Sequence, residues 1–439
     1  MNQPNIVAEA APDERYGWYI VFILILAYTL SYVDRQILTL MVEPIKASLH
    51  ITDVQISLLH GLAFAIFYTL LGVPIARLAD RYNRVKIITT GVFVWSAMTA
   101  VCGLARSFGG LFIARVGVGV GEAALSPAAY SMLADSFGKK NLPKALSLYT
   151  GAIYVGAGLA MIVGGTLIGL VKPIELPFIG HMEPWQTVFL YVAAPGLIVG
   201  LLVATIKEPA RRGVGTASAE FPSLGAMFGY MYARRAAYTP LILGYSACSL
   251  MWNGTTAWIA TFFIRKFGFT AAQIGLVFGL ILLVIGTSGI VLGGVIASRW
   301  RAAGHSDANV RVGILSSAIA LPFGVAAPFA GSAELSLLCF AVFVFGATIP
   351  YGGAAAAFQD ITPNRMRAQV SSIYLLVLNL AGIGLGPTVV ALFTEKVFGD
   401  LQAVGSAISL NIGIGAILSL VLLAMARRPY RAALAVMDA

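Results

Sequence analysis

The chain has 439 residues, of which 59% are hydrophobic and only 11% are charged, with a formal net charge of +10. So few charges cannot cover a soluble domain of this size, whereas helices that face lipid need few. The composition therefore excludes a soluble globular protein and predicts an all-α membrane protein. Cys102, Cys248 and Cys339 all lie in apolar runs, so we expect no disulfide framework, metal site or cofactor.

Apolar stretches of about 20 residues, long enough to cross a bilayer, recur along the chain. They predict twelve transmembrane helices, at residues 17–40, 54–78, 85–105, 109–137, 144–171, 185–206, 238–264, 271–298, 310–331, 335–360, 367–394 and 401–426. Residues 1–16 carry Glu9, Asp13 and Glu14 rather than a basic region, so no cleaved signal peptide is expected. Of the 29 basic residues, 21 fall on one side of this arrangement. The positive-inside rule therefore predicts an inner-membrane protein with both termini in the cytoplasm, and the basicity does not indicate nucleic-acid binding.

The central segment, residues 207–237, divides the predicted helices six and six. It separates an N-terminal bundle, residues 1–206, from a C-terminal bundle, residues 238–439. Residues 221–235 mix apolar side chains with a basic end, which fits either an interfacial helix or an ordinary linker.

The two halves share a pattern of helix-ending acids, basic loops and glycine-rich runs. Asp135 and Asp360 each end a predicted helix and precede a short basic loop and a new helix, and glycine-rich runs follow in both halves. Two pseudo-symmetric six-helix bundles of this kind are typical of alternating-access transporters, whose substrate site lies near the midplane between the halves.

Charged residues inside predicted spans are the first candidates for function, because each costs about 2.5–3.5 kcal/mol at mid-bilayer depth. The first helix contains Asp34 and Arg35, which point about 100° apart and cannot face one point. The fourth contains Arg115 and Glu122, seven residues apart on one face and about 10 Å from each other. Counting along the helices places Asp34 at a depth closer to Arg115 than to Glu122. The alternatives are an interfacial cap at Asp34 and an Arg–Glu pair that only staples helices.

The loop after the second helix contains an acid inside a basic run, Asp80-Arg81-Tyr82-Asn83-Arg84. Topology alone does not explain the acid, so we expect Asp80 to pair with Arg84 or with a neighbouring helix start and to latch one conformation. A plain positive-inside loop is the alternative. The predicted cytoplasmic gate comprises Asp80, Arg81, Arg84, Asp135, Asp360 and Arg367.

The second half offers almost no charge within its predicted spans. Aromatic and small polar residues could instead line an apolar cavity, although contacts with lipid or other helices fit them equally. The candidates for substrate binding in this half are Trp252, Asn253, Trp258, Phe262, Tyr351 and Tyr374.

These motifs carry a resemblance. The loop at Asp80–Arg84 resembles the signature loop of the major facilitator superfamily, and with Tyr32-Val-Asp34-Arg35 and Gly119-Val-Gly121-Glu122-Ala123 it looks like the Spinster family. The resemblance implies a monomeric, proton-coupled secondary transporter of lysophospholipids or sphingosine phosphate. It also implies proton coupling or gating at Asp34, Arg115 and Glu122, and an anionic head group at Arg35, beside Tyr32.

We therefore expect an alternating-access transporter in which the charge state of Asp34 decides whether Arg115 pairs with it or with Glu122. A symporter of small organic anions or sugar acids is the alternative, because such symporters share the Asp-Arg pair. A membrane-embedded lipid enzyme would need a nucleophile with a base or a histidine cluster, and none is visible. A channel is disfavoured by the repeated halves.

Overall fold

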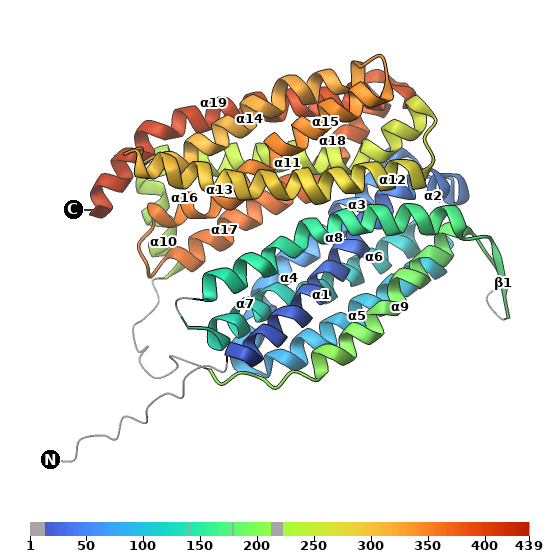
Figure 1. Ribbon diagram of the computed structural model, residues 1–439, viewed down its shortest axis with the longest axis horizontal. Helices are drawn as coiled ribbons and strands as arrows, with labels where there is room; N and C mark the ends of the chain where they lie inside the picture. Colours follow the sequence, from blue (N-terminus) through green and yellow to red (C-terminus); the bar gives the residue numbers. More distant parts are fainter. Residues whose placement is uncertain (1–13, 139–140, 178–179, 212–222, 439) are drawn as a thin grey trace.

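The computed structural model describes residues 14–138, 141–177, 180–211 and 223–438. Long helices form two bundles that lie side by side along their length (Figure 1). We call the end of the molecule that carries the start of α1 and the end of α19 the basic end. The opposite end, which carries the β-hairpin, is the far end.

The N-terminal bundle consists of nine helices and a hairpin. They are α1 (Glu14–Leu40), α2 (Val42–Leu49), α3 (Asp53–His60), α4 (Leu62–Arg81), α5 (Arg84–Leu104), α6 (Phe108–Glu122), α7 (Leu125–Ser136), α8 (Leu142–Leu170), α9 (Pro184–Ala204) and the antiparallel strands β1 (Ile174–Leu176) and β2 (Gly180–Met182).

The second half of the described chain begins with a short helix, α10, in the segment where the sequence allowed an interfacial helix or a linker. Its elements are α10 (Leu224–Ala233), α11 (Arg235–Phe267), α12 (Ala271–Leu280), η1 (Ile281–Gly286), α13 (Thr287–Ala302), α14 (Ala308–Ala326), η2 (Ala327–Phe329), α15 (Ala333–Thr348), η3 (Ile349–Gly352), α16 (Ala354–Asp360), α17 (Arg367–Asn379), η4 (Leu380–Leu385), α18 (Gly386–Leu392), η5 (Phe393–Phe398), η6 (Leu401–Ala403) and α19 (Val404–Asp438).

Within the described residues, eleven helical stretches are long and apolar enough to cross a bilayer, whereas the sequence predicted twelve. The predicted span at 238–264 is not among them, although it lies in the 33-residue helix α11. This helix carries polar side chains such as Ser249, Thr255 and Thr256, which are buried in the protein. Buried polar groups lower the mean hydropathy of a helix without exposing polarity to lipid, so composition alone undercounts such a helix.

The predicted second helix, 54–78, is two helices, α3 and α4, with a break at Gly61. A Cβ atom at Gly61 would lie 2.6 Å from the backbone oxygens of Ile383 and Gly384 in the other bundle. Only glycine allows this approach, so the break marks a point where the bundles meet. The partner segment η4 is a π-helix, a feature often found at functional sites.

Glycines also bring α8 and α12 of the two bundles together. A Cβ atom at Gly158 would lie 2.8 Å from the backbone oxygen of Gly279, and one at Gly165 would lie 2.5 Å from that of Ala271. Gly156, on another face of α8, packs against Thr29 of α1. Small residues let helices approach closely inside a membrane, so the glycine-rich run in α8 serves both its own bundle and the interface.

Candidate functional site

An ion pair inside the N-terminal bundle joins Arg35 of α1 to Glu122 of α6. Nε and Nη2 of Arg35 both lie 2.6 Å from Oε2 of Glu122, and the Ser31 hydroxyl donates to the same oxygen at 2.5 Å. Glu122 is 1% exposed, and its Oε1 has no hydrogen-bond partner within the described part of the chain. In this conformation Glu122 is therefore held by Arg35 rather than by Arg115.

Three aromatic rings surround the Arg35 guanidinium. Its central carbon lies 4.4 Å from the ring centre of Phe64, 4.6 Å from Tyr68 and 5.0 Å from Tyr32. Ring faces attract a cation and leave its N–H edges available for an anion. The rings therefore hold Arg35 in place whether or not Glu122 is its partner.

Asp34 lies beside this pair, and Glu122, the partner of Arg35, is also a charged neighbour of Asp34. Asp34 is 1% exposed, and the side chain of Thr99 lies beside its carboxylate, although neither oxygen meets the geometry of a direct hydrogen bond within the described residues. Its charged neighbours are Glu122, Arg115 and Arg35. Arg115 donates to backbone oxygens instead, to that of Asp34 at 3.2 Å and to that of Leu59 at 3.4 Å. Four ionisable groups from two helices thus share one buried region, with one carboxylate unsatisfied.

A small cavity of about 80 Å³ lies between the bundles at this region. Both arginines, Arg35 and Arg115, line it, and the C-terminal bundle contributes Asn253 and Thr256. About 10–15 Å³ of such volume holds one water, so the cavity has room for several waters. Pockets for drug-sized ligands measure about 300–1,000 Å³. In this conformation the cavity accommodates only a small group, such as an anionic head.

Aromatic residues from both bundles also contact each other across the interface, next along the chain to the cavity residue Asn253. The ring centre of Tyr154 in α8 lies 6.4 Å from Trp252 and 6.3 Å from Tyr351. Tyr351 is 41% exposed although it contacts the opposite bundle, so the space between the bundles is open there. Trp252 also stacks on Phe343.

The other predicted binding residues of the second half lie in the packed interior. Trp258 donates from Nε1 to the backbone oxygen of Pro387 at 2.9 Å, and Phe262 belongs to a cluster of phenylalanines. Tyr374 stacks on Phe358 with ring centres 4.1 Å apart. Tyr32 and Asn253 line the cavity, and Trp252 and Tyr351 contact Tyr154 of the other bundle. The structure thus separates these residues into two groups that the sequence could not distinguish.

The predicted gate residues at the basic end make contacts within their own bundles. Arg84 pairs with Asp135, with which its Nη1 is in contact, and its Nε donates to Glu208 at 2.9 Å. The side chain of Asp80 lies outside the described residues, and Arg81 is exposed. The Arg84 cluster ties α5 to the ends of α7 and α9.

The C-terminal bundle has a similar cluster with the charges reversed. Asp360 accepts from Arg301 at 2.7 Å, and from Asn309 and Tyr430 at 3.0 Å each. Arg367 donates to the backbone oxygens of Gln359 and Thr362. These contacts stabilise the basic end of each bundle as a separate body.

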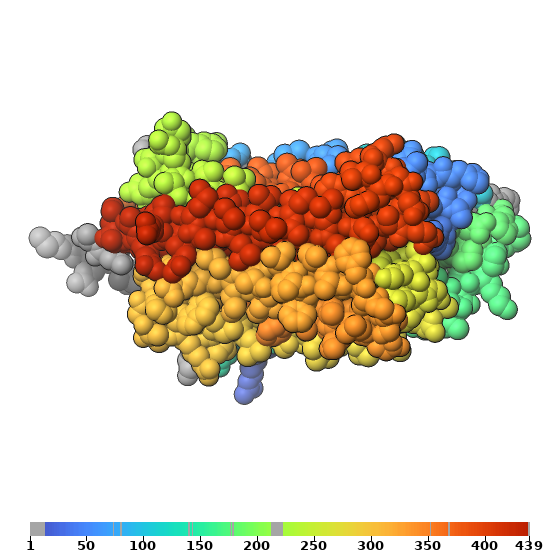
Figure 2. All heavy atoms as spheres, turned by 90° about the horizontal axis from the view of Figure 1, so that it is seen from above, coloured from blue at the N-terminus to red at the C-terminus, as the bar shows by residue number. Residues whose placement is uncertain are grey.

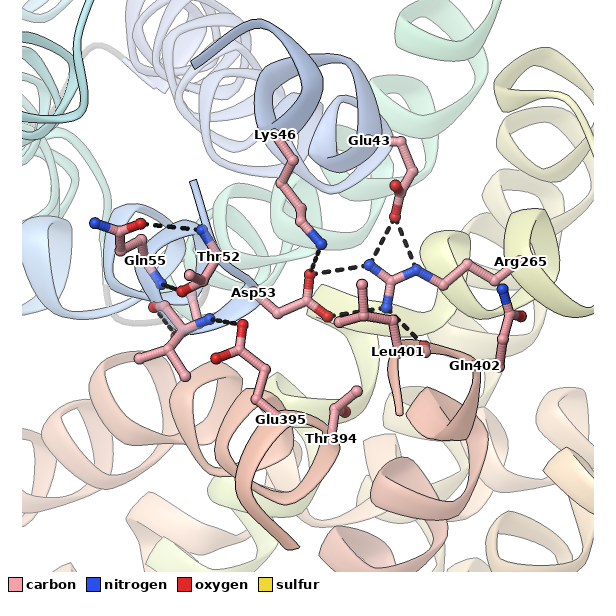
Figure 3. A network of polar contacts seen from close by, with 12 residues as sticks. Glu43, Lys46, Thr52, Asp53, Gln55, Arg265, Thr394, Glu395, Leu401 and Gln402 are labelled. Atoms are coloured by element: carbon pink, nitrogen blue, oxygen red, sulfur yellow. Dashed lines mark hydrogen bonds and ion pairs between the residues drawn. The ribbon is translucent and has the colours of Figure 1, made fainter. Parts of the chain in front are cut away.

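Polar contacts join the two bundles at the far end (Figure 3). Asp53, which is 0% exposed, contacts Lys46 of its own bundle and accepts two 2.9 Å hydrogen bonds from Arg265 of the other. Arg265 also pairs with Glu43 at 2.7 Å, and Glu395 accepts from the Val54 backbone. The far end is therefore closed by charge, while Tyr351 is exposed on the other side of the cavity.

Sequence reasoning missed this network. Asp53 begins α3 behind the capping residue Thr52, and Arg265 lies in the last turn of α11. Each therefore matches the ordinary charge preference of a helix end. The signal available in the sequence was single charged residues of opposite sign near the far-end loops of the two halves. The sequence did not indicate that these residues pair with each other.

The fold and the site define a class of protein: a polytopic helical membrane protein whose two bundles enclose a charged cavity that is closed at one end. Residues 24–387 match the family model described as Major Facilitator Superfamily, and the chain belongs to this family. Members of this superfamily are membrane transporters, so the expected class is confirmed.

Individual similar proteins indicate which members of the superfamily this chain resembles. A Mycolicibacterium smegmatis protein named as an MFS-type efflux pump is 25% identical over 98% of both chains. The Xenopus tropicalis sphingosine-1-phosphate transporter SPNS2 is 26% identical over 71% of this chain and 62% of its own. A crystal structure of a bacterial homologue of the lysosomal transporter Spinster, in an inward-facing and unoccupied conformation, is 27% identical with a TM-score of 0.78, covering 96% of this chain and 97% of that one. The predicted resemblance to Spinster proteins is confirmed.

Proposed function

We propose that this protein is a proton-coupled transporter that moves an anionic, amphipathic, lipid-like substrate by alternating access. The observation that carries the proposal is the Arg35–Glu122 pair beside the unsatisfied Asp34 carboxylate, at a cavity between the bundles. Burying such a pair costs desolvation energy, and ionisable residues inside a membrane usually mark a ligand or proton pathway. An anionic head group is the natural competitor for Arg35.

In this mechanism the substrate head displaces Glu122 from Arg35. The released Glu122 carboxylate then takes a proton or pairs with Arg115, seven residues before it on α6. Asp34, next to Arg115, is the second proton carrier, and its charge state biases Arg115. Each proton that crosses 100 mV supplies about 2.3 kcal/mol, enough to change a two-state population substantially.

The closed end and the open side fit an inward-facing arrangement. The pairing of Asp53 with Arg265 closes the far end, and the exposure of Tyr351 supports an opening toward the basic end. With α11 as the twelfth crossing, both termini lie on the basic side, which the positive-inside rule assigns to the cytoplasm. In the same arrangement, residues 207–237 connect the two bundles on the cytoplasmic side. The protein works as a monomer.

Two observations favour an amphipathic substrate. The cavity at Arg35 is small, and Asn253, which lines it, is preceded in the chain by Trp252, one of three aromatic residues, with Tyr154 and Tyr351, that meet between the bundles. A head group would lie on Arg35 and an apolar tail on the rings. The name of the SPNS2 relative points to the same lipid-phosphate class.

A symporter of small organic anions is the second candidate, because the 80 Å³ cavity by itself would suit a small anion. Trp252→Ala separates the two. Loss of the ring should weaken transport of a lysophospholipid at least fivefold and leave transport of a small organic anion unchanged if the substrate is amphipathic.

Purified protein in proteoliposomes with an imposed pH gradient tests the coupling. We expect Asp34→Asn and Glu122→Gln to abolish proton-driven accumulation of lysophosphatidic acid while substrate exchange continues. Asp400→Asn, which alters an exposed acid at the far end, is the matched control. Full proton-driven accumulation by Asp34→Asn would overturn the proposed coupling. If the protein transports neither lysophospholipids nor small organic anions, the substrate assignment is overturned.

A further inference from the structure

The outer seam between α14 and α19 combines a basic cluster with an apolar surface, and the transport mechanism uses neither. Figure 2 shows α19 lying open along most of one face of the molecule, beside the elements that include α14. At the basic end of this seam, Asp307 is 0% exposed and lies at the centre of three arginines.

The arginines converge from two helices. Arg311 of α14 donates to Oδ1 of Asp307, and Arg427 and Arg431 of α19 donate to Oδ2, each at 2.8 Å. These contacts use one nitrogen of each guanidinium, and the three side chains are 27%, 35% and 45% exposed. One carboxylate thus orients three cations and leaves the cluster with a net charge of +2.

The cluster is fixed before any ligand arrives. Burial acts to raise the pKa of Asp307, but hydrogen bonds from Arg427, Arg431 and Arg311 outweigh it and hold the pKa at about 2. The carboxylate therefore stays ionised at neutral pH, and the arginines stay in place. Preorganised charges bind an anion with less loss of side-chain freedom.

An apolar stripe leads from this cluster toward the far end. Exposed apolar residues lie three or four positions before or after one another on α19, with Ile417 and Leu418 adjacent, so they share one helix face: Ile414, Ile417, Leu418, Val421 and Met425. The next position at this spacing is the exposed Arg428. At the other end of the stripe, an apolar groove of about 750 Å³ lies between α14 and α19, lined by Leu321, Val325 and Leu418 among others.

We propose that the α14–α19 seam binds one anionic phospholipid, with its phosphate on Arg427, Arg428 and Arg431 and its acyl chains along the stripe. Guanidinium groups suit phosphate because they present planar pairs of N–H donors. Topology alone explains arginines at this end of the helices. It does not explain their convergence on a buried acid at the end of an apolar stripe.

Native mass spectrometry of the full-length protein in neutral detergent tests the site, with phosphatidylglycerol and phosphatidylcholine as probes. We expect one phosphatidylglycerol per protein, retained at least tenfold better than phosphatidylcholine. The pair of substitutions Arg427→Gln and Arg431→Gln should reduce that preference about tenfold. Arg427→Lys with Arg431→Lys, which keeps the charge, should retain more of the preference than the glutamine pair.

Arg77→Gln with Lys86→Gln is the matched control, because it removes the same charge from exposed positions at the basic end of the other bundle. The preference should persist there. Because the readout compares two lipids within each variant, a uniform loss of lipid retention does not imitate the effect. Equal retention of both lipids by the wild type, an equal loss in the control, or a second copy of the chain covering the seam would each overturn the proposal.

Discussion

The far-end network predicts that Asp53→Asn opens this end of the protein. In the closed arrangement the carboxylate is fully buried, contacts Lys46 and accepts two hydrogen bonds from Arg265. Removing one partner of a buried ion pair costs about 3–5 kcal/mol. Arg265 keeps Glu43 at 2.7 Å, so we take about 3 kcal/mol. Since about 1.4 kcal/mol is a factor of ten, the closed population should fall relative to the open one by roughly 150-fold. A protein that is about 99% closed would become about 40% closed.

Distances between spin labels measure this change directly. Labels at His50→Cys and Gln402→Cys, exposed far-end positions of the two bundles, are placed in a background without the native cysteines. Asp53→Asn should add a longer distance that accounts for about half of the population. Glu395→Gln, which alters only an acceptor of the Val54 backbone, should change the distribution little. An unaltered distance distribution in folded Asp53→Asn would refute the assignment of the network as a closing contact.

The remaining predictions concern other parts of the molecule. Asp307→Asn should lower stability by about 2 kcal/mol at pH 7, because the folded pKa of about 2 lies below the unfolded value. That contribution is present above about pH 4 and is lost as pH falls toward 2, so thermal midpoints of variant and wild type should converge there. Gly158→Leu should prevent the close packing of α8 on α12 and reduce transport at least tenfold. Gly151→Ala should leave transport unchanged, because a Cβ atom there meets nothing within 4 Å. Transport assays with both variants check this, and equal activities would contradict it. Arg35→Ala should weaken binding of an anionic probe about 10–150-fold, which corresponds to the loss of a hydrogen bond to a charged group. Calorimetric titration measures this affinity, and an unchanged affinity would contradict the role of Arg35.

The sequence was informative where membrane physics acts locally. Apolar length located most of the crossing helices, and the cost of charge in lipid singled out Asp34, Arg35, Arg115 and Glu122. The structure places all four in one buried region.

The sequence did not decide which charges pair. Seven-residue spacing relates Arg115 to Glu122 within one helix, but the observed partner of Glu122 is Arg35 on another helix. Likewise, Trp252 and Phe262 share a motif on α11, yet only Trp252 faces Tyr154 of the other bundle. Pairing between helices depends on their rotation and crossing, which a pattern within one helix does not encode.

The sequence by itself thus determined that this is a helical membrane protein and which ionisable groups lie within it, because insertion into lipid is governed by the composition of each segment. The tertiary structure alone decided that Asp53 meets Arg265 and that Asp307 gathers three arginines. Those contacts join residues more than 100 positions apart, with the exception of Arg311. The first needs the two bundles to approach at glycines such as Gly158 and Gly279, and the second needs α14 to lie against α19, as it does at Gly313, so their energies depend on packing and not on local sequence.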